Sequence, residues 1–120
     1  MKIACTASGD TLEAAFDNRF GRAEKFIIYD TGTDSYHVLD NTQNLQSAQG
    51  AGVQAAQNVV NSGATVLITG HLGPKAARVI FAAGVEAFHA DADTVAQALA
   101  MFKSKALKVL KDADVDGHWV

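Results

Sequence analysis

Two short segments of this chain combine glycine with cationic side chains, a combination that suits an anionic ligand. The first segment, 18–23, reads Asn-Arg-Phe-Gly-Arg-Ala, and the second, 70–76, reads Gly-His-Leu-Gly-Pro-Lys-Ala. Arginine carries a permanent charge and five N–H donors, while glycine lets backbone N–H groups approach a ligand closely. If the fold brings the two segments together, we expect a cationic pocket lined with backbone amides.

The second segment stands where α/β proteins often bind ligands. It follows the apolar run Ala64–Thr69, which is typical of a buried strand, and Pro74 suits the first turn of a helix. In open α/β sheets, ligands bind at the carboxyl ends of strands, where the amino end of the next helix favours an anion. The glycines would equally serve a tight strand-to-helix turn. Arg19 and Arg22 would equally be solvated beside a buried Phe20.

Three side chains are candidate metal ligands, although the sequence does not identify a metal. His71 and His89 both follow predicted strands, so each could bind a metal or donate to a sulfide or a phosphate. Cys5 lies near the end of the first strand, and a thiolate would suit Cu(I). A buried, small apolar role for Cys5 is the alternative. His37 lies in the middle of a predicted strand, and we expect it on the surface.

Arrangements typical of enzymes are missing from the sequence. Ser8 has no nucleophile motif around it. The apolar strands Lys2–Thr6 and Ala64–Thr69 carry no carboxylate that could hold the two metal ions of a nuclease. The acidic segment 112–117 matches only the first half of a calcium-binding EF-hand loop. We therefore expect no catalytic residues and no enzymatic activity.

Composition narrows the class of protein further. The chain has 120 residues, of which 48% are hydrophobic and 19% charged, values that indicate a folded domain. Its net charge of -3 argues against a broad nucleic-acid-binding surface. A single cysteine excludes an intramolecular disulfide and a four-thiolate metal site within the chain. With no apolar run of membrane-spanning length and no signal-peptide pattern at Met1, we expect a cytoplasmic protein with no membrane partner.

Hydrophobic periodicity predicts an α/β domain with a mixed sheet of about five strands that contains an antiparallel hairpin, with helices on both faces. We expect a single domain over 1–110, followed by an acidic tail over 111–120. The predicted strands are Lys2–Thr6, Lys25–Asp30, Ser35–Asp40, Ala64–Thr69 and Val85–Phe88, and the predicted helices are Ala51–Asn61, Lys75–Ala83 and Val95–Leu110.

Both glycine segments, together with the hairpin between them, resemble the dinitrogenase iron–molybdenum cofactor biosynthesis family. The resemblance is carried by 16–23, by 66–76 and by Gly84 with the residue after it, and it covers about 1–110. It implies a ribonuclease H-like fold without nuclease chemistry, and binding of an anionic metal–sulfur cluster. Many members have histidine just before the Phe-Gly pair, whereas this chain has Arg19. That difference disfavours an imidazole–metal bond there and favours charge pairing with the sulfides of a cluster.

The resemblance also indicates which residues would hold the cluster. The Phe-Gly-Arg turn of the family falls on 20–22, and its glycine-rich turn falls on 70–74. We expect the loop 41–52 to act as a wall that adds backbone amides. The candidate cofactor-binding residues are Arg19, Phe20, Gly21, Arg22, Gly50, Gly52, Gly70, His71, Leu72, Gly73 and Lys75.

The small size and stand-alone domain resemble family members that carry a molybdenum–copper sulfide cluster. An iron–molybdenum type of cluster is the other cargo that the resemblance implies. In either case we predict storage or transfer of a cluster, with protein partners in cluster delivery, cell division or redox complexes that the sequence does not identify. The alternative is a regulatory module that binds a phosphorylated metabolite or a nucleotide at the same glycine-rich edge.

Overall fold

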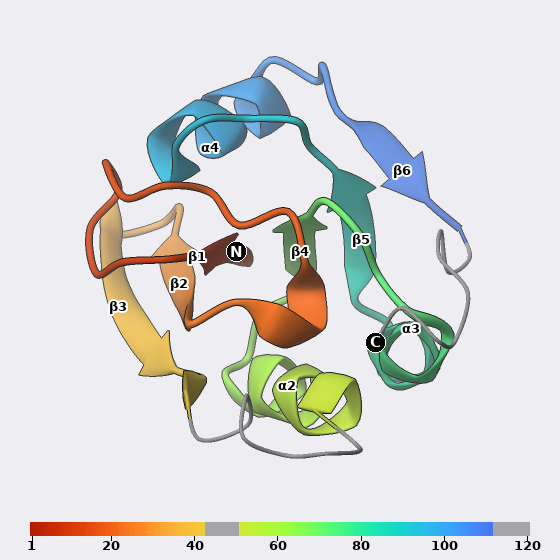
Figure 1. Ribbon diagram of the computed structural model, residues 1–120. Coiled ribbons are helices and arrows are strands. Elements are labelled where there is room, and N and C mark those ends of the chain that lie inside the picture. Colours follow the sequence, from red (N-terminus) through yellow and green to blue (C-terminus); the bar gives the residue numbers. More distant parts are fainter. Residues whose placement is uncertain (43–50, 112–120) are drawn as a thin grey trace.

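One mixed sheet forms the centre of the molecule (Figure 1). The computed structural model describes residues 1–42 and 51–111, and within them the sheet has six strands in the order β3-β2-β1-β4-β5-β6. The strands are β1 Lys2–Ala7, β2 Lys25–Asp30, β3 Ser35–Asp40, β4 Val66–Thr69, β5 Glu86–His89 and β6 Lys108–Leu110.

Strand direction divides the sheet into an antiparallel and a parallel part. β2 pairs antiparallel with both β1 and β3, so the predicted hairpin is confirmed with both of its strands at the predicted bounds. β4 lies parallel between β1 and β5. All four residues of β4 are buried, as expected for a strand covered on both faces. The carboxyl ends of β1, β4 and β5 therefore meet at one edge of the sheet, where the candidate residues lie.

Helices cover both faces of the sheet, as predicted (Figure 1). α2 (Ala51–Asn61) and α3 (Pro74–Ala82) pack on one face, over a buried cluster that contains Phe26 and Leu67. α4 (Val95–Lys103) packs on the other face. The cluster beneath α4 contains Ile3, Cys5, Ile27, Ile68 and Leu99. Among residues 1–42 and 51–111, no helix is long and apolar enough to cross a membrane.

The end of the chain differs from the sequence prediction. α4 ends at Lys103 instead of Leu110, because Lys105 adopts a left-handed φ of 62° and the N–H of Ala106 turns back to the carbonyl of Met101. The apolar residues that follow form β6, which pairs antiparallel with β5 and gives six strands instead of about five. Most of the predicted acidic tail, 112–120, lies outside the described residues.

Candidate functional site

The structure brings the two glycine segments into direct contact. The N–H of Phe20 donates to the carbonyl of His71 at 3.1 Å, and the N–H of His71 donates to the carbonyl of Asn18 at 2.7 Å. Arg19 and His71 therefore face each other in a short parallel bridge. Two segments that lie fifty residues apart in the chain thus form one backbone unit at the carboxyl edge of the sheet.

Gly70 is required for this contact. A Cβ atom at Gly70 would lie 2.4 Å from the carbonyl oxygen of Asn18 and 2.6 Å from the Cβ of Asn18. Contacts that short do not occur in folded proteins, so any side chain at this position would push the two segments apart. The glycine therefore serves close packing of two backbones.

The segment 16–22 crosses the edge of the sheet from one helical layer to the other (Figure 1). Phe16 belongs to the core cluster beneath α4, whereas Phe20 belongs to the cluster beneath α2 and α3. Two buried threonines lie under the crossing. Thr6 donates its hydroxyl to the carbonyl of Asp17, and the hydroxyl of Thr69 lies 3.3 Å from that of Thr6. The segment then forms a single 3-10 turn, η1, over Phe20–Arg22.

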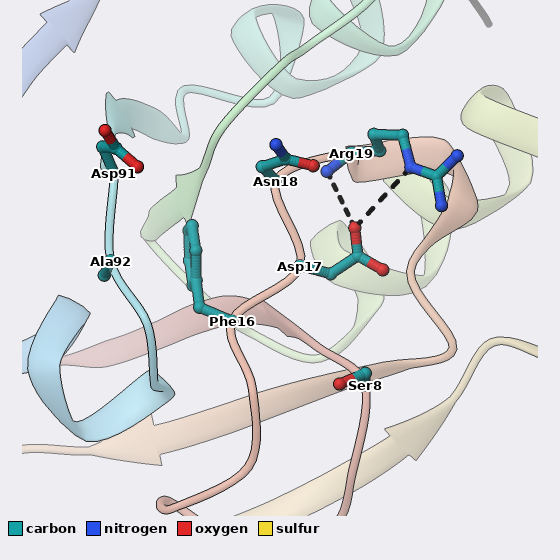
Figure 2. Close-up of a pocket in the computed structure, with 7 residues that line it drawn as sticks. All are labelled: Ser8, Phe16, Asp17, Asn18, Arg19, Asp91 and Ala92. Carbon is teal, nitrogen blue, oxygen red and sulfur yellow. Dashed lines mark hydrogen bonds and ion pairs between the residues drawn. The ribbon is translucent and has the colours of Figure 1, made fainter.

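The cations of the site differ in how far they are neutralised. The Arg19 side chain is 65% exposed, and its Nε lies 4.0 Å from Oδ1 of Asp17, which also accepts the backbone N–H of Arg19 at 2.9 Å (Figure 2). Arg22 is half-buried in η1, and Lys75 is exposed in the first turn of α3. Neither Arg22 nor Lys75 has an ion pair within the described part of the chain. Their charges therefore remain available to an anion.

Glycine also sets the position of two helix starts near η1. A Cβ atom at Gly21 would lie 3.3 Å from the Cα of Gly52, so η1 and the first turn of α2 touch backbone to backbone. Gly73 is the N-cap of α3 and makes no side-chain cap, so no side chain of its own neutralises the partial positive charge of that helix terminus. Gly50, predicted to lie in the wall of the site, is outside the described residues.

Phe20 and Leu72 do not have the role that the sequence suggested. Both were candidate cofactor-binding residues, but both side chains are fully buried in the core cluster under α2 and α3. The ring of Phe20 packs against Phe26 with 5.2 Å between centroids. The backbone N–H groups of Phe20 and His71 are already hydrogen-bonded within the protein, so these two amides are not offered to a ligand.

Of the three candidate metal ligands, the two histidines lie close together and the cysteine lies apart. The ring centroids of His71 and His89 are 6.2 Å apart, and Nδ1 of His89 lies 2.7 Å from the carbonyl oxygen of Gly70. Cys5 is fully buried in the cluster beneath α4, on the face of the sheet opposite α2 and α3. Burial raises the pKa of the Cys5 thiol far above its ordinary range, which disfavours a metal-binding thiolate. His37 is exposed on β3, as predicted.

A separate cavity of about 290 Å³ lies beside the crossing segment, and it is not the predicted pocket (Figure 2). It shares only Arg19 with the predicted set, and two of its side chains are carboxylates. Sequence reasoning missed Asp17, although the Asp-Asn-Arg spacing is typical of a turn in which a carboxylate accepts the N–H two residues on. The cavity is lined by Ser8, Phe16, Asp17, Asn18, Arg19, Asp91 and Ala92.

Comparison with known proteins identifies the family. Residues 1–105 match the family model described as dinitrogenase iron-molybdenum cofactor. Because the match covers most of the chain, the protein belongs to this family, and the resemblance inferred from the residues is confirmed.

Individual relatives agree with this assignment. The apo form of the orange protein from Desulfovibrio gigas shares 36% identity, with 95% of this chain and 96% of that chain covered and a TM-score of 0.91. An NMR structure of a Thermotoga protein that belongs to the DUF35 family shares 32% identity over 95% of this chain and 97% of that chain, with a TM-score of 0.84. An uncharacterized protein of Methanocaldococcus jannaschii is 27% identical over 85% of each chain. These likenesses confirm the predicted α/β fold class.

Proposed function

We propose that this protein binds an anionic metal–sulfur cluster at the joined glycine turns, and that it stores or transfers the cluster without chemical turnover. The observation that carries the proposal is the pair of backbone hydrogen bonds between 18–20 and His71. These bonds gather cations from two distant parts of the chain at one edge of the sheet. The family to which the chain belongs, named for the iron–molybdenum cofactor of dinitrogenase, supports a cluster as the ligand.

The charge distribution supports an anion at this edge. The whole chain has a net charge of -3, yet Arg22 and Lys75 have no ion pair within the described residues. The amino end of α3 adds partial positive charge next to Lys75. A thiometallate is large, soft and weakly hydrated, so guanidinium groups can pair with its sulfides at a small cost in desolvation. Attraction of this kind requires no covalent protein ligand.

For the identity of the cargo, we propose a molybdenum–copper sulfide cluster. Its support is the resemblance of this small, stand-alone domain to family members that carry such a cluster, together with the 36% identity to the orange protein over nearly the whole of both chains. The orange protein structure is of an apo form, which implies that the relative also exists with a ligand bound.

The test is to reconstitute the cluster in the apo-protein. Anaerobic apo-protein is titrated with tetrathiomolybdate and a copper salt and then desalted, and its visible spectrum and metal content are measured. We expect a retained chromophore with a fixed ratio of molybdenum to copper. A colourless, metal-free protein after desalting would contradict the proposal and would favour a phosphorylated metabolite or a nucleotide as the ligand.

A set of arginine variants locates the site. We expect Arg19→Ala combined with Arg22→Ala to lose the chromophore on desalting. Arg78→Ala is the matched control, because Arg78 is an exposed arginine on α3 that borders a different groove, with Val60 and Ala82. Equal retention in the double variant and in the control would place the cluster elsewhere on the protein.

A further inference from the structure

The contact between His89 and Gly70 fixes which ring nitrogen of His89 is free to bind a metal. A carbonyl oxygen only accepts hydrogen bonds, so the 2.7 Å contact with the Gly70 carbonyl requires the hydrogen on Nδ1 of His89. In the neutral ring, Nε2 then carries the lone pair. Histidine ligands of metals usually have this arrangement, with the second ring nitrogen donating to a backbone carbonyl or a carboxylate.

The second imidazole of the pair is held in place from its backbone. His71 follows Gly70 directly, and its N–H and carbonyl are both hydrogen-bonded to the crossing segment, at Asn18 and Phe20. His89 is the last residue of β5 and is paired in register with Thr69 of β4. The two histidines therefore come from neighbouring parallel strands at the same edge of the sheet.

The spacing of the two rings fits a shared metal ion. A zinc–imidazole bond is about 2.0–2.1 Å long, so two rings on one ion have centroids roughly 5–6 Å apart. The centroids of His71 and His89 are 6.2 Å apart, with 54° between the ring planes. The backbone of His71 is fixed, but its side chain is exposed, so a small rotation of that side chain would close the remaining gap.

We infer that His71 and His89 form a two-imidazole site for one late first-row transition-metal ion, with Nε2 of His89 as the fixed ligand. Imidazole suits zinc, copper and nickel among these ions. Within residues 1–42 and 51–111, no third histidine, cysteine or carboxylate joins the pair. The remaining coordination positions are left to water or to sulfur atoms of the cargo. The inference rests on the proposed function in its location and deepens it, because it gives the cluster one direct point of attachment.

Binding of Zn²⁺ in the absence of sulfide tests the two-imidazole site independently of cluster binding. Apo-protein is titrated with Zn²⁺ by calorimetry in the absence of sulfide, and the ring nitrogens are followed by long-range proton–nitrogen NMR. We expect one equivalent of Zn²⁺ to bind and the Nε2 resonance of His89 to move. We expect His71→Ala and His89→Ala each to weaken binding at least tenfold.

Two control variants account for the other histidines. His37→Ala removes the exposed histidine of β3, and His118→Ala removes the histidine outside the described residues, and both should leave Zn²⁺ affinity unchanged. Unchanged affinity in His71→Ala and His89→Ala, or a His89 Nε2 resonance that does not move in the unaltered protein, would overturn the inference. The NMR titration uses the unaltered protein, so its result stands even if a histidine variant fails to fold. Cluster retention without Zn²⁺ binding would overturn this inference alone and leave the proposed function standing.

Discussion

The crossing segment 16–22 separates two regions of opposite character at the carboxyl edge of the sheet. On the side of α2 and α3 lie Arg22 and Lys75, two cations with no ion pair among the described residues. On the side of α4 lies a hollow of about 290 Å³ bordered by the carboxylates of Asp17 and Asp91 (Figure 2). Arg19 borders this hollow, whereas Arg22 and Lys75 do not. Because the ligand we propose is a polyanion, we place it by the cations without an ion pair among the described residues and not by the hollow.

The largest expected effect comes from breaking the joint between the two glycine turns. Gly70→Ala places a Cβ atom against the carbonyl of Asn18, so the segments must separate and the cations must disperse. We expect cluster retention to fall more than tenfold and the free energy of unfolding to fall by about 1–3 kcal/mol, as for other overpacked sites. Desalting of the reconstituted protein and urea denaturation measure the two effects.

Gly32→Ala is the control for Gly70→Ala. Gly32 lies in the exposed turn of the hairpin, where a Cβ atom would meet only the side-chain Oδ1 of Asp30, at 3.3 Å. We expect this variant to retain the cluster normally. Normal retention in Gly70→Ala as well would show that the joined turns are not needed for binding.

The next effect distinguishes the two arginines of the site. Arg22 is half-buried and has no ion pair with a described residue, whereas Arg19 is exposed and lies beside Asp17. We expect Arg22→Ala to lower cluster retention about tenfold or more, because hydrogen bonds to charged groups contribute about 1.5–3 kcal/mol. We expect Arg19→Ala to lower it only about threefold, as for an exposed, partly neutralised charge. Competition with added free tetrathiomolybdate compares the two affinities. The reverse order of the two variants would contradict the assignment.

Removing a carboxylate should have a smaller effect and the opposite sign. Asp17→Asn leaves an oxygen that accepts the N–H of Arg19 but removes the charge that lies 4.0 Å from Nε. We expect affinity for the cluster to rise about two- to threefold, within the range measured for exposed charge pairs. Asp91→Asn, which alters the same cavity without touching Arg19 through any described ion pair, should change the affinity less. A cluster bound in the cavity itself would respond to both variants alike.

The smallest effect on cluster binding is expected for Cys5, which lies on the opposite face of the sheet and whose burial acts on stability instead. Burial raises the pKa of its thiol, so the folded protein keeps the proton when the unfolded chain has already lost it. Stability should therefore be unaffected below the ordinary thiol pKa of about 8.5 and should fall as the pH rises above it, by at most about 1.4 kcal/mol per pH unit. Urea denaturation between pH 7 and pH 10, compared with Cys5→Ala, measures this slope.

A second measurement on Cys5 bears on the metal site. We expect the thiol to be unreactive toward a disulfide reagent in the folded protein and reactive in urea, both with and without the cluster. Rapid modification of the folded apo-protein that the cluster then blocks would restore Cys5 as a ligand.

Local sequence signals predicted most of the fold. The hairpin strands Lys25–Asp30 and Ser35–Asp40 and the helix Ala51–Asn61 were predicted at their observed bounds, because β-branched and aromatic runs and helical spacing are strong local signals. The end of α4 could not be predicted, since the apolar residues after Lys105 fit a helix or a strand equally well. Pairing with β5 decides the outcome, and that pairing is a tertiary contact.

Candidate residues for the site could be chosen from the sequence, but the way in which the two turns join could not. Glycine and arginine marked the two turns, yet the register between Arg19 and His71 depends on how the hydroxyl of Thr6 holds the carbonyl of Asp17. The burial of Phe20 followed from the same docking, and nothing in its neighbours distinguished a core ring from an apolar wall. The approach of His71 and His89 follows from the parallel pairing of β4 and β5, which the sequence predicts only as a shared edge.

The backbone hydrogen bonds that join the two turns also bear on how a cargo would leave. Because the N–H groups of Phe20 and His71 bind to each other's segments, they contribute nothing to holding an anion. Retention then depends on side-chain charges, of which Arg22 is half-buried while Lys75 and Arg19 are exposed, and salt screens exposed charges over a distance of about 8 Å at physiological ionic strength. The affinity of such a carrier for its cargo therefore depends on the ionic strength and on nearby charged surfaces. An acceptor protein with a denser cationic surface could remove the cargo without unfolding any part of the carrier.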